Sequence, residues 1–345
     1  MSATDDPTKL DTDAVEAWLT EHLEGFEGPI KAEKFAGGQS NPTFRLTTPS
    51  GRYVLRRKPP GKLLKSAHAV DREFRVQSAL ADTDVPVAKM HILCEDESVI
   101  GSMFYVMDAI DAGNFVDPRM PELTNEQRAR VFTEMSRVLA AIHDVDIEAV
   151  GLSDYGPEGN YYERQIGRWT KQYRASETDV IPAMEGLIDW LGTNMPPDDG
   201  QRTLAHGDYR LDNLLFAADG SQCLAVLDWE LSTIGHPYAD LAAVIMQWQM
   251  PPGEQGKGLA GIDRAALGIP SDAEFIAQYC ARRGLTEIPH FNFYLAFTFF
   301  RMAAIIQGVY KRALDGNASN PERGLALGPS VQKFAQAGLE AAQNG

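Results

Sequence analysis

The chain has 345 residues, of which 44% are apolar, and it carries a formal net charge of −16 at pH 7. This length suits about two domains, and the apolar content is ordinary for a globular protein with a buried core. Affinity for nucleic acid comes chiefly from clustered Lys and Arg, so the strong negative charge argues against a nucleic-acid partner.

The cysteines and the first residues bear on the cellular compartment. Cys94, Cys223 and Cys280 form no CxxC pair, and an odd number of cysteines supports neither a disulfide framework nor a zinc knuckle. Residues 1–18 are polar and acidic, without the basic and then apolar layout of a signal peptide. We therefore expect a cytoplasmic protein.

The first 111 residues are expected to form a small antiparallel sheet with one helix, preceded by a short helix near the N-terminus. Strands are indicated by β-branched and aromatic runs between glycine turns, and helices by apolar residues at helical spacing. In chain order we predict two strands around Gly37-Gly38, a strand after the turn at Ser50-Gly51, a helix over 66–83, and strands over 89–96 and 102–110.

The segment after "DAGNFVDPRMPEL" is mostly helical in pattern, so we expect a boundary near Ala112 and a larger second lobe over 112–345. The first of its helices has a predicted cap at Thr124 or Asn125. Further helices are predicted over 161–176 and 180–195, a strand over 223–230, and helical structure from Pro237 onward, apart from the loop 251–261.

One apolar segment, 291–312, raises the question of a membrane span. Arg301 interrupts it near the middle, and no uncharged run reaches the roughly 18 residues that a membrane helix needs. We predict a buried core helix and no membrane partner.

The residues with the clearest chemistry lie in and after the stretch "LAHGDYRLDNLLF". Asp208 sits in a His-Gly-Asp turn, Asn213 follows five positions later, and Asp228 ends the next predicted strand. Two carboxylates and an amide brought together in this way suit Mg²⁺, which prefers oxygen ligands. The pattern matches the catalytic loop and metal-binding elements of phosphoryl-transfer enzymes with a protein-kinase-like fold.

The chain resembles the aminoglycoside phosphotransferase and choline kinase superfamily, whose signature is a His-x-Asp-x-x-x-x-Asn loop followed by an Asp-bearing strand. It is most similar to the kinase-like domain that some animal proteins carry fused to an acyl-CoA dehydrogenase, and to its free-standing bacterial relatives. Seven blocks in the same order carry the resemblance: "GGQSNPTF", "YVLRRKPPGKLL", "SAHAVDREFRV", "RQIGRW", "HGDYRLDNL", "VLDWELSTIGHPYADLA" and "FTFFRMAAIIQGVYKR".

The resemblance implies an α+β, protein-kinase-like fold with two lobes, and a role for each signature residue. Asp208 would accept or orient the proton of a substrate hydroxyl. Asn213 and Asp228 would hold Mg²⁺ on the phosphates of ATP. His206 is expected to brace the loop by hydrogen bonding, and Asp240 to tie a helix start to it; an ordinary helix cap is an equally good interpretation of Asp240.

The nucleotide site is expected in the first lobe. A glycine-containing hairpin would cover the phosphates with Gly37, Gly38, Gln39 and Ser40, because glycines allow close backbone approach. Met107 would line the adenine pocket, and the backbone of Asp108 and Ile110 would hydrogen-bond the base.

The strand "YVLRRK" departs from the family pattern. Where a kinase-like fold presents a Lys, this chain has Arg56, with Glu73 as its expected partner from the next helix. Arg keeps the charge and can grip phosphate bidentately, but it is not equivalent to Lys. Lys58 lies on the same face of the predicted strand and remains a possible substitute.

Substrate selection is expected in the second lobe. Arg164 and Arg168 lie four residues apart on one predicted helix, close to Trp169. This face suits either an anionic substrate, such as a coenzyme A thioester, or simple solvent exposure. Arg210, in the catalytic loop, is a further candidate for contact with the substrate.

The sequence thus predicts an ATP- and Mg²⁺-dependent kinase that phosphorylates a hydroxyl of a small molecule. The resemblance implies a hydroxyacyl-CoA acceptor and a functional link to an acyl-CoA dehydrogenase, whereas the net acidity suits a polycationic, aminoglycoside-like acceptor. A non-catalytic nucleotide-binding regulator, and a metal-dependent hydrolase using His206 and His236, are the alternatives of other classes.

Overall fold

The computed structural model describes residues 9–35, 41–59, 69–253, 257–318 and 320–343. Gly37, Gly38, Gln39 and Ser40, predicted to cover the phosphates, lie outside these ranges. The chain divides into two compact units. The first contains Met1–Phe115, Glu148–Leu152 and Leu211–Ser232, and the second contains Val116–Ile147, Ser153–Arg210 and Thr233–Gly345.

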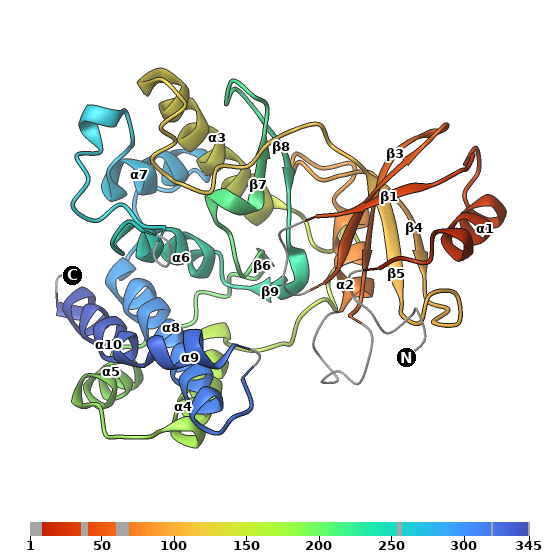
Figure 1. The fold of residues 1–345 in the computed structure, drawn as a ribbon. Helices are drawn as coiled ribbons and strands as arrows, with labels where there is room; N and C mark the ends of the chain where they lie inside the picture. Colours follow the sequence, from red (N-terminus) through yellow and green to blue (C-terminus); the bar gives the residue numbers. More distant parts are fainter. Residues whose placement is uncertain (1–8, 36–40, 60–68, 254–256, 319, 344–345) are drawn as a thin grey trace. The chain divides into compact units, whose positions relative to one another are not determined.

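The first unit is built on a five-stranded antiparallel sheet (Figure 1). Its strands, in spatial order, are β1 (Lys31–Lys34), β2 (Thr43–Thr48), β3 (Gly51–Arg57), β5 (Phe104–Asp108) and β4 (Met90–Cys94). The tight turn that joins β2 to β3 is closed at Gly51, whose φ of 153° is one that an L residue rarely adopts. The sequence pattern predicted all five strands near these positions.

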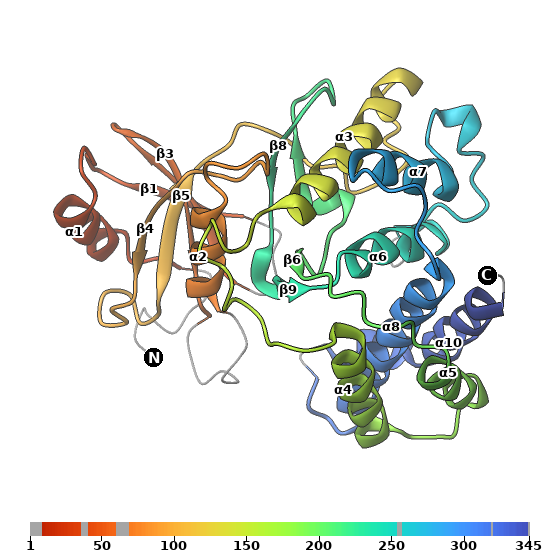
Figure 2. The ribbon, with the colours of Figure 1, turned by 180° about the vertical axis from the view of Figure 1, so that it is seen from behind.

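The two helices of this sheet region, α1 (Thr12–His22) and α2 (Val70–Ala79), cover opposite faces of the sheet. Successive side chains of a strand point to opposite faces. Leu55 packs in the same cluster as Val15 and Leu19 of α1, whereas Val54 packs with Val70 of α2. Figure 2 shows the two helices on either side of the strands.

A late segment of the chain completes the first unit. The 3₁₀ turn η1 (Leu211–Asn213) leads into a hairpin of β7 (Leu214–Phe216) and β8 (Cys223–Val226), which is followed by the turn η2 (Trp229–Leu231). Val226 N–H donates to the carbonyl oxygen of Pro86 at 2.9 Å, and Gly113 forms a β-bridge with Phe216. The segment is thus joined to the first unit by backbone hydrogen bonds.

The second unit is mainly helical and contains one two-stranded sheet, β6 with β9. Helix α3 starts where the sequence predicts, because Thr124 and Gln127 form a capping box. The elements are α3 (Asn125–Asp144), α4 (Tyr161–Ser176), α5 (Pro182–Thr193), β6 (Thr203–Ala205), β9 (Thr233–Gly235), α6 (Tyr238–Trp248), η3 (Ala265–Leu267), α7 (Asp272–Arg282), α8 (Phe291–Leu314), α9 (Pro321–Ala326) and α10 (Gly328–Gln343).

Helix α8 is the central element of the second unit and contacts α4, α5, α6, α9 and α10. Within the described ranges it is the one helix long and apolar enough to cross a membrane, but 67% of its most apolar window is buried inside the protein. Burial of this kind is typical of a core helix that is apolar on most of its surface.

Candidate active site

The β7–β8 hairpin brings the two predicted metal ligands to one of its ends. Leu214 pairs with Val226, and the backbone N–H of Leu227 donates to the carbonyl oxygen of Asn213 at 2.8 Å. Asp228 follows directly after Leu227. The antiparallel register therefore places Asn213 and Asp228 together, although 14 residues separate them along the chain.

Asp228 has φ 65° and ψ 56°, in the left-handed region. This conformation is uncommon for a residue other than glycine, and it persists only where the surroundings enforce it. Here, the hydrogen-bonded hairpin precedes Asp228, and Trp229, which follows it, is fully buried. The chain is thus held at both sides of a residue that is a candidate metal ligand.

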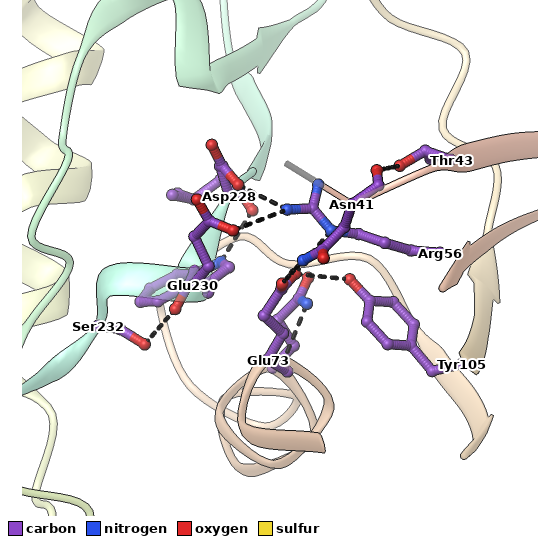
Figure 3. A network of polar contacts seen from close by, with 11 residues as sticks. Asn41, Thr43, Arg56, Glu73, Tyr105, Asp228, Glu230 and Ser232 are labelled. Carbon is purple, nitrogen blue, oxygen red and sulfur yellow. Dashed lines mark hydrogen bonds and ion pairs between the residues drawn. The ribbon is translucent and has the colours of Figure 1, made fainter. Parts of the chain in front are cut away.

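Arg56 links Asp228 to the helix α2 (Figure 3). Its Nη2 lies 2.7 Å from Oδ1 of Asp228, its Nε lies 2.9 Å from Oε2 of Glu73, and Glu230 is 3.9 Å away. The ion pair between Arg56 and Glu73 that the sequence predicts is therefore present. Lys58, which the sequence offered as a substitute for the usual lysine, instead has its Nζ 4.0 Å from Oδ1 of Asp71.

Glu73 is almost fully buried and has further partners. Asn41 donates to its Oε1 at 2.8 Å, and the Tyr105 hydroxyl donates to its Oε2 at 3.0 Å (Figure 3). Burial raises the pKa of Glu73 to about 7, against the opposing charge of Arg56. The charge of Asp228 contributes to the rise.

This donor set fits a divalent cation. A single guanidinium faces the carboxylates of Glu73, Asp228 and Glu230, so negative charge is in excess around it. Asn213 and Asp228 offer amide and carboxylate oxygens, and one or two such protein ligands completed by phosphate and water are typical of Mg²⁺. Arg56 contacts Oδ1 of Asp228, so Oδ2 is the oxygen that this residue can offer to a metal.

The predicted catalytic loop is anchored by a buried carboxylate from α6. Asp240 accepts hydrogen bonds from two consecutive backbone N–H groups, His206 at 2.6 Å and Gly207 at 2.8 Å. Gly207 has φ 84°, which glycine adopts without strain. The loop residue before Asp208 is therefore fixed by an element outside the loop, as the resemblance implies.

A buried chain of hydrogen bonds extends from Asp240 to α7. His143 Nε2 lies 3.4 Å from Asp240 Oδ2, and His143 Nδ1 lies 2.7 Å from the Tyr279 hydroxyl. Burial would raise the pKa of Asp240, but the hydrogen bonds from His143 and from the backbone N–H of Gly207 help to outweigh it and lower that pKa. Burial lowers the pKa of His143.

With Asp240 ionised and His143 neutral, each hydrogen bond of this chain has a defined direction. An ionised carboxylate can only accept, so neutral His143 must carry its proton on Nε2 and donate to Asp240. Nδ1 of His143 then accepts from the Tyr279 hydroxyl. The chain thus runs in one direction, from Tyr279 through His143 to Asp240, where the backbone amides of the catalytic loop converge.

Asp208 lies at the end of this loop with about a third of its side chain exposed, 34%. Arg210 Nε is 3.4 Å from its Oδ1, so the arginine predicted for the substrate contacts the candidate base. The backbone N–H of Asp208 donates to Nδ1 of His206 at 3.3 Å. His206 braces the loop in this way. His236, which the hydrolase hypothesis also invoked, has its Nε2 3.3 Å from Oδ1 of Asp199.

The predicted adenine-binding residues lie at the end of β5. Met107 is buried and packs in the cluster that contains Val54. The backbone N–H of Asp108 donates to the carbonyl oxygen of Lys89 at 2.9 Å, so it is not available to a base in this structure. Ile110 is half-buried just beyond the strand.

The predicted substrate residues of α4 come together with one residue that the sequence analysis did not select, Arg301 of α8. The guanidinium carbons of Arg168 and Arg301 lie 5.5 Å and 6.0 Å from the ring centre of Trp169. Arg301 Nη2 also donates to the carbonyl oxygen of Gly207 at 3.4 Å. A lone charge in an otherwise apolar run was the signal that could have identified Arg301.

A cavity of about 120 Å³ opens beside the first turn of α4 in the second unit. Its lining includes Tyr161, Arg164, Asp199 and His236, and it includes none of Asp208, Asn213 and Asp228. Asp208, the candidate base of the same unit, is therefore not part of the cavity wall.

The comparisons with solved structures identify the class of protein. A candidate aminoglycoside phosphotransferase from Ralstonia eutropha JMP134 is 50% identical, with a TM-score of 0.89 over 97% of this chain and 99% of that one. A spectinomycin phosphotransferase solved with ADP and spectinomycin is 15% identical, with a TM-score of 0.63 over 96% and 99% of the two chains. The chain therefore has the kinase-like fold of the phosphotransferases, as predicted.

The family follows from the sequence comparisons. Residues 31–289 match the model of the phosphotransferase enzyme family, and the chain belongs to that family. Among curated proteins, acyl-CoA dehydrogenase family member 10 of Mus musculus is 47% identical over 85% of this chain. The match covers only 27% of the mouse protein, so the chain spans about a quarter of that relative's length.

Proposed function

We propose that this phosphotransferase is an ATP- and Mg²⁺-dependent kinase that transfers the γ-phosphoryl group to a hydroxyl of a small molecule. The observation that carries the proposal is the β7–β8 hairpin, which sets Asn213 beside Asp228 and places Asp228 on the Arg56–Glu73 ion pair. A metal-binding acid next to a cation–carboxylate pair is the arrangement that phosphoryl transfer in kinase-like folds uses.

In the proposed reaction Asp208 accepts the proton of the acceptor hydroxyl. The hydroxyl oxygen forms a bond to the γ-phosphorus as the bond to the departing ADP oxygen breaks. The contribution of Asp208 depends on its orientation, and Asp240 supplies that by holding the amides of His206 and Gly207. Positioning of this kind and electrostatic stabilisation account for most of the catalysis of phosphoryl transfer.

The first unit would hold the nucleotide. Mg²⁺ bound by Asn213 and Asp228 would neutralise charge on the phosphates. Arg56 would contact the phosphates from β3 while Glu73 keeps its side chain in place. Ile110 would contact the base beside Met107, and Asp108 could do so only through a group other than its N–H, which is bonded to Lys89.

For the acceptor we propose a hydroxyacyl-CoA. The mouse relative, at 47% identity, bears the name of an acyl-CoA dehydrogenase family member, which supports an acyl thioester and a functional link to such a dehydrogenase. An aminoglycoside is the second candidate, because the solved phosphotransferase of the same fold was crystallised with spectinomycin and the chain is strongly acidic.

The test combines turnover with equilibrium binding. Purified protein is incubated with MgATP and a panel of hydroxyacyl-CoAs and aminoglycosides, and phosphorylated product is measured by mass spectrometry. We expect product from at least one acceptor, and its loss in Asp208→Asn with ATP-dependent thermal stabilisation retained. Stabilisation by ATP without product from any acceptor would instead support the non-catalytic regulator.

A further inference from the structure

Three arginines of the second unit stand close to one tyrosine and have no acidic partner among the described residues. Tyr161 and Arg164 lie in the first turn of α4, Arg168 lies one turn on, and Arg301 comes from α8. Burial raises the pKa of the Tyr161 hydroxyl; the charges of Arg301, Arg164 and Arg168 oppose that rise, and the charge of Asp240 adds to it. All three guanidinium groups are thus within electrostatic reach of the same hydroxyl.

Within the described ranges, no carboxylate lies within 4.0 Å of Arg164, Arg168 or Arg301. Further along the same helix, Arg174 pairs with Glu177 and Glu185. Among the described residues, the chain therefore supplies an acidic partner to Arg174 of α4 but not to Arg164 or Arg168.

This arrangement costs stability when nothing is bound. Like charges four residues apart on a helix repel each other, and Arg164 and Arg168 have that spacing. A positive charge in the first helical turn, where Arg164 lies, also opposes the helix dipole. The Nε of Arg164 is buried and without a hydrogen-bond partner within the described ranges. A bound anion would remove each of these costs.

The cluster lies next to the catalytic loop of the same unit. Trp169, fixed by a hydrogen bond from its Nε1 to Gln165 at 3.0 Å, has both Arg168 and Arg301 near its ring. A Cβ added at Gly235 would lie 2.9 Å from Cε2 of Tyr161, so the glycine leaves room for that ring. Arg301 also contacts the carbonyl oxygen of Gly207, the residue before Asp208.

We infer that Tyr161, Arg168 and Arg301, flanked by Arg164, form a subsite for an anionic group, phosphate or carboxylate, that the phosphoryl acceptor carries. The inference rests on the proposed kinase function and specifies the chemical class of its acceptor. Guanidinium groups bind such oxyanions through short, charge-assisted hydrogen bonds, and a tyrosine hydroxyl adds a neutral donor. The same positive cluster disfavours a polycationic aminoglycoside.

The test uses one hydroxyacyl group on two carriers, coenzyme A, which is anionic, and N-acetylcysteamine, which is neutral. For Arg301→Gln and for Arg168→Gln we expect KM for the coenzyme A form to rise by about tenfold or more. We expect KM for the neutral form and for ATP to stay unchanged. Arg323→Gln is the matched control, because Arg323 is an exposed arginine of α9, which packs on α8 near Val309 and Ala313.

Competition by inorganic phosphate distinguishes a subsite that binds the acceptor from one that binds ATP. If the subsite belongs to the acceptor, inorganic phosphate competes with the coenzyme A form and not with ATP. Equal changes in KM for the charged and the neutral acceptor would overturn the inference. If no acceptor is phosphorylated, the proposed function fails, and equilibrium binding of the coenzyme A thioester then decides: weaker binding to Arg301→Gln supports the subsite, and unchanged binding overturns it.

Discussion

Arg56 contacts two carboxylates at once, and its removal leaves Glu73 buried without its counter-charge. Without Arg56, buried Glu73 and nearby Asp228 lose their shared counter-charge. Breaking a buried ion pair by removing one partner typically costs about 3 kcal/mol or more. We therefore expect Arg56→Met to lower the free energy of unfolding by about 3 kcal/mol in urea titrations.

A double mutant isolates the contribution of the ion pair. Arg56→Met combined with Glu73→Gln removes the unpaired charge, so we expect it to lose clearly less stability than the two single changes added together. Arg52→Met on the same strand is the control, because Arg52 and its partner Asp111 are exposed and such pairs contribute under about 1 kcal/mol. Additive losses at Arg56 and Glu73 would contradict the coupling.

Glu73 also predicts a pH dependence of stability. Its pKa is about 7 in the folded chain, against an ordinary value of 4.5. At pH values between these two pKa values, the folded state binds this proton more tightly than the unfolded state. The stabilisation from protonated Glu73 is therefore fully present below about pH 4.5 and is lost as the pH rises through about 7.

The shift corresponds to a loss on the order of 3 kcal/mol across that range. We expect Glu73→Gln to flatten the fall in stability between pH 5 and pH 7, as measured by urea unfolding at each pH. A fall of unchanged size in Glu73→Gln would show that another group is responsible.

At the scale of elements, α6 and the catalytic loop are coupled through Asp240. An asparagine there has a single acceptor oxygen for the two amides of His206 and Gly207. A buried donor left unpaired costs about 1–3 kcal/mol, so we expect Asp240→Asn to destabilise the protein by that amount and to lower kcat more than it changes KM for ATP.

The measurements for Asp240→Asn are urea unfolding, steady-state kinetics and the amide chemical shift of Gly207. Asp144→Asn is the control, because Asp144 is an exposed acid at the end of α3 that pairs with Arg283. An unshifted Gly207 amide in Asp240→Asn would show that the loop does not depend on this carboxylate.

Close helix packing in the second unit predicts opposite effects for two glycines. A Cβ at Gly338 of α10 would lie 2.6 Å from Cδ2 of Leu187 and 3.0 Å from Cβ of Phe299, whereas one at Gly167 of α4 meets nothing within 4 Å. Gly167→Ala should therefore gain about 0.5–1 kcal/mol from helix propensity. Overpacking costs about 1–3 kcal/mol, so Gly338→Ala should be the less stable of the two in thermal melts.

Local signals made most elements predictable, whereas contacts between distant segments were not. The capping residues at Thr124 and the turn at Gly51 act on their own neighbours, so their sequence pattern is sufficient. The pairing of Arg56 with Glu73 followed only from a family resemblance. The tie between Asp240 and the catalytic loop also followed from the resemblance, because contacts with backbone amides leave no side-chain pattern. Arg301 was interpreted as an interruption of a core helix because its partners lie on α4 and on the catalytic loop.

At the scale of the whole molecule, the first compact unit is assembled from three stretches of the chain. A boundary near Ala112 stays a prediction, but Leu211–Ser232 belongs by its contacts to the unit that starts at the N-terminus. That stretch supplies the β7–β8 hairpin, the carboxylate that pairs with Arg56, and Trp229, which is fully buried. The first unit can therefore be completed only after more than half of the chain has been synthesised.

This assembly predicts how fragments of the first unit behave. Met1–Phe115 alone lacks the strand that bonds to Pro86 and the partner of Gly113, so we expect no cooperative thermal transition by circular dichroism. A matched polypeptide that joins Leu211–Ser232 to Phe115 through a flexible Gly/Ser linker restores those contacts, so it should unfold cooperatively and bind MgATP weakly. If Met1–Phe115 alone melts as sharply as the joined polypeptide, the late segment is not needed for the fold of this unit.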